Sequence, residues 1–219
     1  MSPESDVTAR VAGWLAGFVV AENLCPFAGQ AMRSGALDIQ VLTGETAAVL
    51  QILAAEAAQL VEPGAHPDAT RLLALTDARF ARLDDYLDLV EIADALLDEL
   101  GLRGLVQLAS FHPDYLFEGE PPGDPSHWTN RSPVPLLHLL REEAVERALL
   151  RHPDPDAIPV RNIAHLRGLG LAEVRRRVQA SAEGAAQVSA QASAQDSARD
   201  FAQGAPQPGH SAPFSEPEA

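Results

Sequence analysis

The sequence predicts an α/β fold with a small, largely parallel sheet of about three strands. Three short apolar stretches support this prediction, at residues 37–43, 71–76 and 105–110. Helical periodicity separates them, over residues 45–60 and 84–100, and such alternation is typical of β-α-β units. We therefore expect a β-α-β-α-β core whose three strands end at one edge, where the ligands of such sheets gather.

Further helices are expected on both sides of this core. Residues 7–22 place apolar side chains along one helical stripe, as in a helix that packs against a core. A short helix follows Pro26, a longer one covers residues 132–149, and a basic one covers residues 160–179. The sequence thus predicts one α/β domain over residues 1–180.

The composition changes at the C-terminal end of this domain. Residues 181–219 are rich in Ala, Gln, Ser, Gly and Pro and contain the local repeat SAQASAQDSA. A segment of this kind has too few large apolar side chains to form a core. We expect it to be a disordered tail.

The charged residues exclude several classes of protein. The 219-residue chain has a formal charge of −15, and all 16 basic residues are arginines. The absence of lysine excludes Schiff-base catalysis by a lysine and a Walker-type phosphate loop. Because phosphate contacts dominate affinity for nucleic acids, so acidic a chain is a poor nucleic-acid binder.

The cysteine content and the hydropathy of the chain indicate where in the cell the protein is found. Cys25 is the single cysteine, so the chain forms no internal disulfide and has no cysteine pair for structural zinc. No stretch approaches the roughly 20 apolar residues that cross a membrane, and the first residues lack the pattern of a signal peptide. We expect a cytoplasmic protein that does not bind membranes.

Residues 104–143 concentrate the side chains that can do chemistry. A strand ends at Ser110, and His112 follows it directly. The loop after His112 then carries Asp, Tyr, Phe, His, Trp, Asn and Arg residues, although aromatics make up only 5% of the chain. Long loops in compact domains are usually functional or disordered, and the aromatic content favours function.

Three separated motifs resemble one known bacterial family. In chain order they are NLCPFA, SFHP and TNRSPVPLLHLLRE, and the chain resembles the family catalogued as domain of unknown function 1415 over roughly residues 5–180. No activity is attached to that family. The resemblance implies motif positions at Asn23, Cys25, Pro26, Phe27, His112, Pro113, Asn130, Arg131, Ser132, Pro133, His138 and Arg141, with Val134 in place of an expected aromatic residue.

The residue types suggest roles for the catalytic candidates. Cys25, at the expected N-cap of the short helix, is a candidate nucleophile because the helix dipole favours a thiolate; as a lone cysteine it equally fits a small buried apolar residue. His112 is a candidate general acid or base, or else a brace for its loop. Asn130 is a candidate orienting or oxyanion group. Cys-Pro-Phe-Ala is also similar to the thiol loop of glutaredoxin-like proteins, which leaves a redox role open.

A second set of residues suggests substrate binding. Asn130 and Arg131 lie just before an expected helix that Ser132 can cap, and a helix N-terminus with a guanidinium is an anion site. The alternative is an arginine that clamps the loop. Asn23, His138 and Arg141 complete the substrate-binding set. We therefore expect a pocket walled by residues 23–27 and 111–131, and an enzyme, a hydrolase or transferase, that acts on a small anionic molecule without a cofactor.

Two other functions remain open. His138 and Glu142 lie one helical turn apart in the expected helix, and with His112 they would form a two-histidine, one-carboxylate metal site. A non-catalytic module whose loop binds another protein is the other alternative. The sequence does not predict the oligomeric state.

Overall fold

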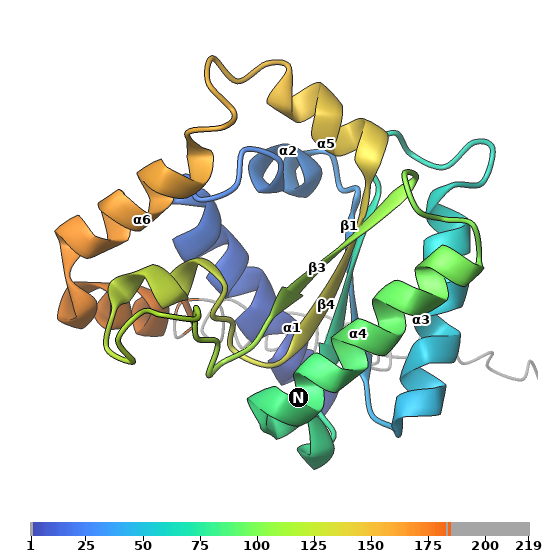
Figure 1. Ribbon diagram of the computed structural model, residues 1–219, viewed down its shortest axis with the longest axis horizontal. Helices are drawn as coiled ribbons and strands as arrows, with labels where there is room; N and C mark the ends of the chain where they lie inside the picture. The colour runs from blue at the N-terminus through green and yellow to red at the C-terminus, as the bar shows by residue number, and fades with distance from the viewer. Residues whose placement is uncertain (1, 183, 185–219) are drawn as a thin grey trace, which may run out of the picture.

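The computed structural model describes residues 2–182 and residue 184. Figure 1 shows a sheet with helices on both of its faces. The helices are α1 (Pro3–Trp14), the π-helix η1 (Leu15–Val20), α2 (Ala28–Arg33), α3 (Thr46–Leu60), the 3₁₀ helix η2 (Ala78–Ala81), α4 (Leu83–Glu99), the 3₁₀ helix η3 (Pro125–Thr129), α5 (Glu142–Leu149), α6 (Ile158–Leu169) and a helix at residues 171–182. The strands are β1 (Leu37–Leu42), β2 (Thr70–Leu75), β3 (Val106–Phe111) and β4 (Leu136–Arg141).

The sheet has four strands in the order β1-β2-β4-β3. Strands β1 and β2 pair in parallel, as expected for a β-α-β unit. Strand β4 is antiparallel to both of its neighbours, β2 and β3. The α/β class is confirmed and the three expected strands are present, but the prediction of a largely parallel sheet is wrong because β4 lies between β2 and β3.

Strand β4 occupies part of the helix predicted over residues 132–149. Leu136, Leu137, Leu139 and Leu140 are all buried, on both faces of the sheet. A central strand buried on both faces reads as a continuous apolar run, and leucine is also a good helix former. Pairing with β2 and β3 makes this run a strand, and the predicted helix is limited to its last part, α5.

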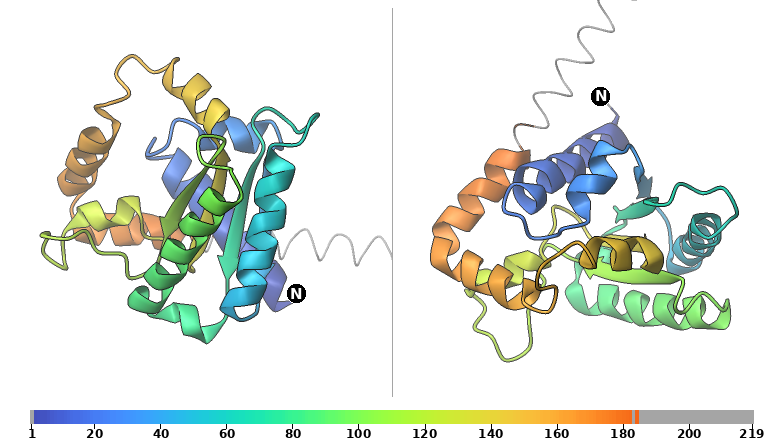
Figure 2. Two further views of the ribbon diagram at one scale, coloured as in Figure 1. Left: turned by 45° about the vertical axis from the view of Figure 1, so that its right-hand side comes forward. Right: turned by 90° about the horizontal axis from the view of Figure 1, so that it is seen from above.

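Helices α3 and α4 cover one face of the sheet (Figure 2). Their apolar sides pack on Leu73 and Leu75 of β2 and on Leu137 and Leu139 of β4. Tyr86 of α4 is fully buried there. This layer holds the largest apolar cluster, and it leaves the opposite face for the N-terminal helices.

The opposite face of the sheet carries α1, η1, α2 and α5. Trp14 and Phe18 pack against Leu72 and Leu136 of the sheet, and a smaller cluster joins α2 and α5 to Leu140. Toward β3 this helix layer is incomplete, since Gln107 is exposed and Phe111 only half-buried. The candidate site lies over this part of the sheet.

The C-terminal helices differ from the single helix expected over residues 160–179. Gly170 adopts φ 78°, a conformation that glycine reaches without strain, and it ends α6 before the helix at residues 171–182 begins. The predicted tail, residues 181–219, lies almost entirely outside the described residues. The extent of the single domain, residues 1–180, stays a prediction.

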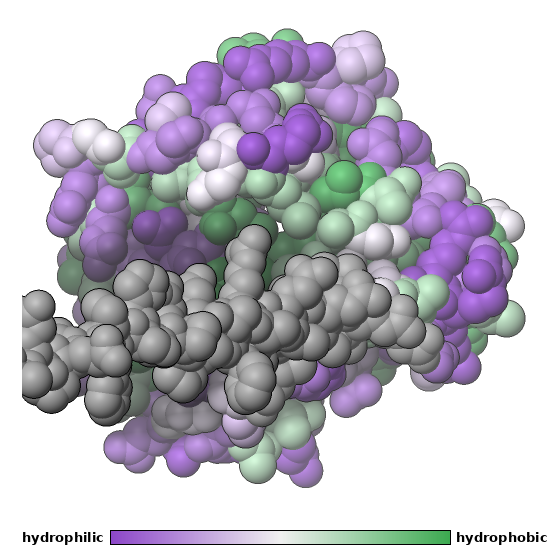
Figure 3. Space-filling view, turned by 180° about the vertical axis from the view of Figure 1, so that it is seen from behind, coloured by the Kyte–Doolittle hydropathy of each residue, from purple (hydrophilic) through white to green (hydrophobic). Residues whose placement is uncertain are grey.

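Two observations concern the surface. Figure 3 shows hydrophilic residues around most of the periphery of the face opposite to that in Figure 1, with apolar residues toward its middle. Among the helices of the described residues, none has the length and apolar content that crossing a bilayer requires.

Candidate functional site

The turn that carries Cys25 joins η1 to α2. Asn23 has φ 54°, a left-handed conformation that asparagine tolerates better than most residues. Helix α6 holds this turn from outside: Arg161 donates to the Asn23 carbonyl oxygen at 2.6 Å, and the Asn162 amide donates to the Leu24 carbonyl oxygen at 2.7 Å. Asn23 therefore shapes the turn that presents Cys25.

Cys25 is half-buried and lies two residues before the N-cap of α2. Phe27, and not Cys25 as predicted, is the N-cap. Burial raises the pKa of the Cys25 thiol above its ordinary value, and hydrogen bonds from the backbone N–H groups of Ala28 and Phe27 offset only part of that effect. The resting thiol is therefore protonated at neutral pH.

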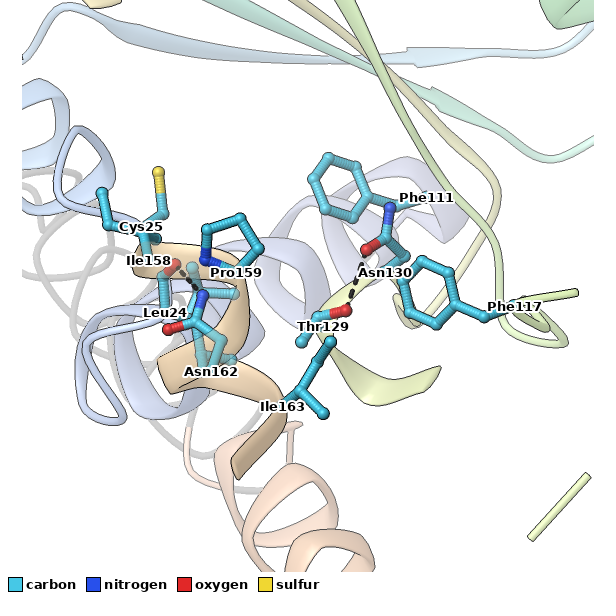
Figure 4. Close-up of a pocket in the computed structure, with 11 residues that line it drawn as sticks. Leu24, Cys25, Phe111, Phe117, Thr129, Asn130, Ile158, Pro159, Asn162 and Ile163 are labelled. Carbon is cyan, nitrogen blue, oxygen red and sulfur yellow. Dashed lines mark hydrogen bonds between the residues drawn. The ribbon is translucent and has the colours of Figure 1, made fainter. Parts of the chain in front are cut away.

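Cys25 opens into a cavity of about 400 Å³, here called the loop-side chamber. Figure 4 shows residues of α6 on one side of it and residues of the loop on the other. The lining residues are Val19, Leu24, Cys25, Phe111, Phe117, Thr129, Asn130, Ile158, Pro159, Asn162 and Ile163.

A second cavity, the sheet-side chamber, has a volume of about 320 Å³. Its floor is the uncovered part of β3 and β4, and its walls are the Cys25 turn, α5 and the start of α6. The lining residues are Leu24, Cys25, Pro26, Phe27, Gln107, Ala109, Phe111, His138, Leu140, Val145, Ala148, Leu149, Pro155, Ile158 and Pro159. Five residues line both chambers: Leu24, Cys25, Phe111, Ile158 and Pro159. The two chambers therefore adjoin, with Cys25 among the residues at their junction, and together they are here called the cleft.

Asn130 lies in the cleft, on the side opposite α6. Its side-chain oxygen accepts a hydrogen bond from the Thr129 hydroxyl at 2.9 Å, which Figure 4 marks. Its backbone oxygen accepts from the N–H of His112 at 3.1 Å. The bond with His112 fixes the loop against the end of β3. Asn130 and Cys25 line the same cavity, which residues 23–27 and 111–131 were expected to wall.

His112 does not line either chamber. It is fully buried, and its Nε2 donates to the Phe80 carbonyl oxygen at 3.0 Å. Its Nδ1 accepts from the N–H of Asp114 at 3.0 Å, and its ring packs on Tyr86 at 5.1 Å. With both nitrogens engaged the imidazole has none free for a substrate, so this geometry matches the bracing alternative.

The two expected arginine ligands point elsewhere. Arg131 donates to the Tyr115 carbonyl oxygen at 2.9 Å and lies over the Trp128 ring, as a loop clamp does. Arg141 follows Leu140 of the sheet-side chamber, but its guanidinium donates to the Ala65 carbonyl oxygen at 3.5 Å and to the Glu143 carboxylate at 3.3 Å. Neither guanidinium lines a chamber.

Ser132 also has a different role from the one predicted. Its hydroxyl donates to the Val134 carbonyl oxygen at 2.6 Å, and the segment that follows is β4 instead of a helix. The expected anion site at a helix N-terminus is therefore not formed at this position.

His138 lies in the middle of β4 and lines the sheet-side chamber. Its Nε2 is 2.7 Å from the hydroxyl oxygen of Thr70, a fully buried residue of β2. Burial lowers the pKa of His138 to about 4, so the ring is neutral at neutral pH. His138, and not His112, is the imidazole that shares a chamber with Cys25.

The proposed metal ligands do not come together. Glu142 follows the end of β4, whereas His112 lies beyond the opposite end of the neighbouring strand. Within residues 2–182 and 184 no group of three His, Cys, Asp or Glu side chains could hold a metal ion. The strand at β4 removes the helical spacing on which the set of His112, His138 and Glu142 depended.

Helix α6 is the part of the site that the sequence did not reveal. It contributes Ile158, Pro159, Asn162 and Ile163 to the cleft. Arg167, in its last turn, pairs with Asp124 and Glu120 of the loop. The sequence predicted only a basic helix over residues 160–179, and no pattern in it indicated a cavity wall.

Comparison with known proteins identifies the family. Residues 6–176 match the family described as Protein of unknown function (DUF1415). The chain belongs to this family. The match confirms the resemblance inferred from the three motifs, and in this DUF1415 protein it spans every candidate residue from Asn23 to Arg141. No curated protein and no solved structure matches the chain.

Proposed function

We propose that the protein is a thiol-dependent enzyme, a transferase or hydrolase, that acts on a small and largely apolar carbonyl compound. The observation that carries this proposal is the position of Cys25 at the junction of two adjoining chambers. Each chamber falls within the size range of small-molecule sites, which are concave and mostly apolar. A substrate that spans the junction would place its central atoms at the sulfur.

The substrate class differs from the anion expected from the sequence. The residues that line the two chambers include no arginine, and the chain has no lysine. A carboxylate or phosphate bound there would lose its hydration without gaining a cation, which is costly. The lining therefore favours a neutral ligand.

The proposed chemistry follows from a thiol beside two backbone amides. The Cys25 sulfur adds to the carbonyl carbon, the bond from that carbon to the leaving group breaks, and the leaving group departs with the thiol proton. Water or another acceptor then takes the acyl group and restores the thiol. The N–H groups of Phe27 and Ala28 stabilise negative charge on the sulfur.

The test uses p-nitrophenyl butyrate, a neutral ester with an apolar body. We expect rapid release of one p-nitrophenolate per chain and a butyryl group on the peptide that contains Cys25, both lost in Cys25→Ser. Because Cys25 is the single cysteine, the urea-unfolded chain supplies the matched control for an unassisted thiol. An acylation rate no faster than that of the unfolded chain would contradict catalysis by Cys25. Binding of the ester without acylation would indicate that the protein binds small molecules but is not an enzyme.

A further inference from the structure

The hydrogen bonds of Thr70 determine which nitrogen of His138 carries the proton. The Thr70 hydroxyl oxygen lies 2.7 Å from the Leu139 carbonyl oxygen and 2.7 Å from His138 Nε2. A hydroxyl has one proton, and a carbonyl oxygen can only accept. Thr70 therefore donates to Leu139 and must accept from an N–H at His138 Nε2.

This assignment leaves His138 Nδ1 with a free lone pair. A neutral imidazole carries one N–H, so the second nitrogen is an acceptor. Among the described residues, none forms a hydrogen bond with Nδ1, while His138 is half-buried and lines the sheet-side chamber. The low pKa of His138 agrees with a neutral ring. Nδ1 is not one of the fully buried unpaired atoms of the described residues, so it is open to solvent and a donor from a ligand can reach it.

The rest of the chamber defines the body of that ligand. Its walls are mainly Leu, Phe, Val, Ile, Ala and Pro side chains, and they contain no charged group. We propose that the sheet-side chamber binds a neutral, largely apolar molecule carrying one hydroxyl or N–H group, which donates a hydrogen bond to His138 Nδ1. This subsite goes beyond the proposed acyl chemistry, because it requires only the lone pair of His138 and not a reactive Cys25.

The experiment compares para-cresol with its methyl ether, which keeps the ring and loses the O–H donor. Dissociation constants are measured by NMR titration of protein labelled with ¹⁵N in its histidine rings. We expect para-cresol to bind about tenfold tighter than the ether, the factor that one net hydrogen bond supplies, with a change in the Nδ1 resonance of His138. The anion para-toluate should bind more weakly than para-cresol.

Four variants separate this subsite from its alternatives. His138→Phe keeps an aromatic ring in the chamber and should abolish the preference for para-cresol, whereas the same change at the exposed His66 should leave it intact. Cys25→Ser should also retain the preference, so failure of the thiol chemistry would not be mistaken for failure of the subsite. Thr70→Val removes the partner of Nε2 and should reduce the preference.

Several results would overturn the proposal. Equal affinity for para-cresol and its ether would do so, as would the absence of saturable binding by either compound. The NMR spectrum of the unliganded protein gives an independent answer even if His138→Phe fails to fold. An Nδ1–H tautomer of His138 in that spectrum would show that the free acceptor does not exist.

Discussion

At the scale of single residues, Cys25 combines accessibility with a protonated resting state. Burial raises the pKa of its thiol more than the N–H groups of Ala28 and Phe27 lower it. We therefore predict that iodoacetamide alkylates Cys25 more slowly in the folded protein than in the urea-unfolded chain at neutral pH, and that the pH midpoint of the folded rate lies above 9.0. Alkylation followed by mass spectrometry across a pH series measures both. Faster alkylation of the folded protein would indicate a thiolate, and hence a site that stabilises charge before any ligand arrives.

His138 gives a second prediction at this scale, on stability against pH. Its pKa in the folded protein is about 4, against an ordinary value of 6.5. As the pH falls from 6.5 to 4, His138 becomes protonated in the unfolded chain but stays neutral in the folded chain. The free energy of unfolding therefore decreases across this window, by at most about 3 kcal/mol. Above pH 6.5 the contribution of the neutral ring is complete.

Urea unfolding of the wild type and of His138→Phe isolates this effect, because the other titrating groups are common to both chains. The difference between their free energies of unfolding should change in favour of the variant as the pH falls through the window. A difference that stays constant with pH would mean that His138 titrates normally in the folded protein, with its ring open to water.

At the scale of elements, the sequence predicted some parts of the structure far better than others. Strands β1, β2 and β3 lie within one residue of their expected bounds, because each is a short apolar stretch between turn residues. Strand β4 was missed because its leucine-rich run fits a buried helix as well as a buried strand, and only its partners decide. Because the prediction for His138, Arg141 and Glu142 relied on that helix, their arrangement was wrong as well.

The same limit applies to the cleft. Cys25 and Asn130 were expected to share a cavity because both lie in motifs at the ends of elements, and they line the same chamber. The bond between Thr70 and His138 and the wall formed by α6 depend on contacts between distant segments. No local pattern in the sequence encodes either of them.

The prediction at the scale of elements concerns the bond by which α6 holds the Cys25 turn. Asn162 is buried, and its amide donates to the Leu24 carbonyl oxygen at 2.7 Å. Asn162→Ala should destabilise the protein by about 1–2 kcal/mol, because it leaves a buried carbonyl without a donor. Chemical denaturation measures the loss. Arg161→Ala is the comparison on the neighbouring residue: it removes an exposed bond to Asn23 and a part-buried bond to the Asn162 side-chain oxygen but leaves the bond from Asn162 to Leu24 in place, so the cost should be smaller, about 0.5 kcal/mol. Equal costs would mean that burial of the bond is not what holds the turn.

At the scale of the whole molecule, the carboxylate of Glu22 in the N-terminal layer bonds to both C-terminal helices. Glu22, just beyond η1, accepts from His165 of α6 at 2.8 Å and from Arg177 of the last described helix at 2.6 Å. Burial tends to raise the pKa of Glu22, but the hydrogen bonds from His165 and Arg177 outweigh it and lower the pKa below 4.5. The contribution of Glu22 to stability is therefore complete above pH 4.5 and is lost as the pH falls through its folded value.

Because α6 forms one wall of the cleft, weakening this junction should loosen the site before it affects the sheet. We predict that Glu22→Gln increases amide hydrogen exchange in residues 158–182 by about threefold to tenfold and leaves exchange in β2 and β4 unchanged. Hydrogen exchange with mass spectrometry resolves the two regions. Glu173→Gln is the matched control, since Glu173 also pairs with Arg177 at 2.7 Å but within the same helix, and it should loosen the cleft much less. If both variants gave the same exchange, the last helix would be held by its apolar contacts alone, with Val174 fully buried, and the cleft wall would not depend on the charge of Glu22.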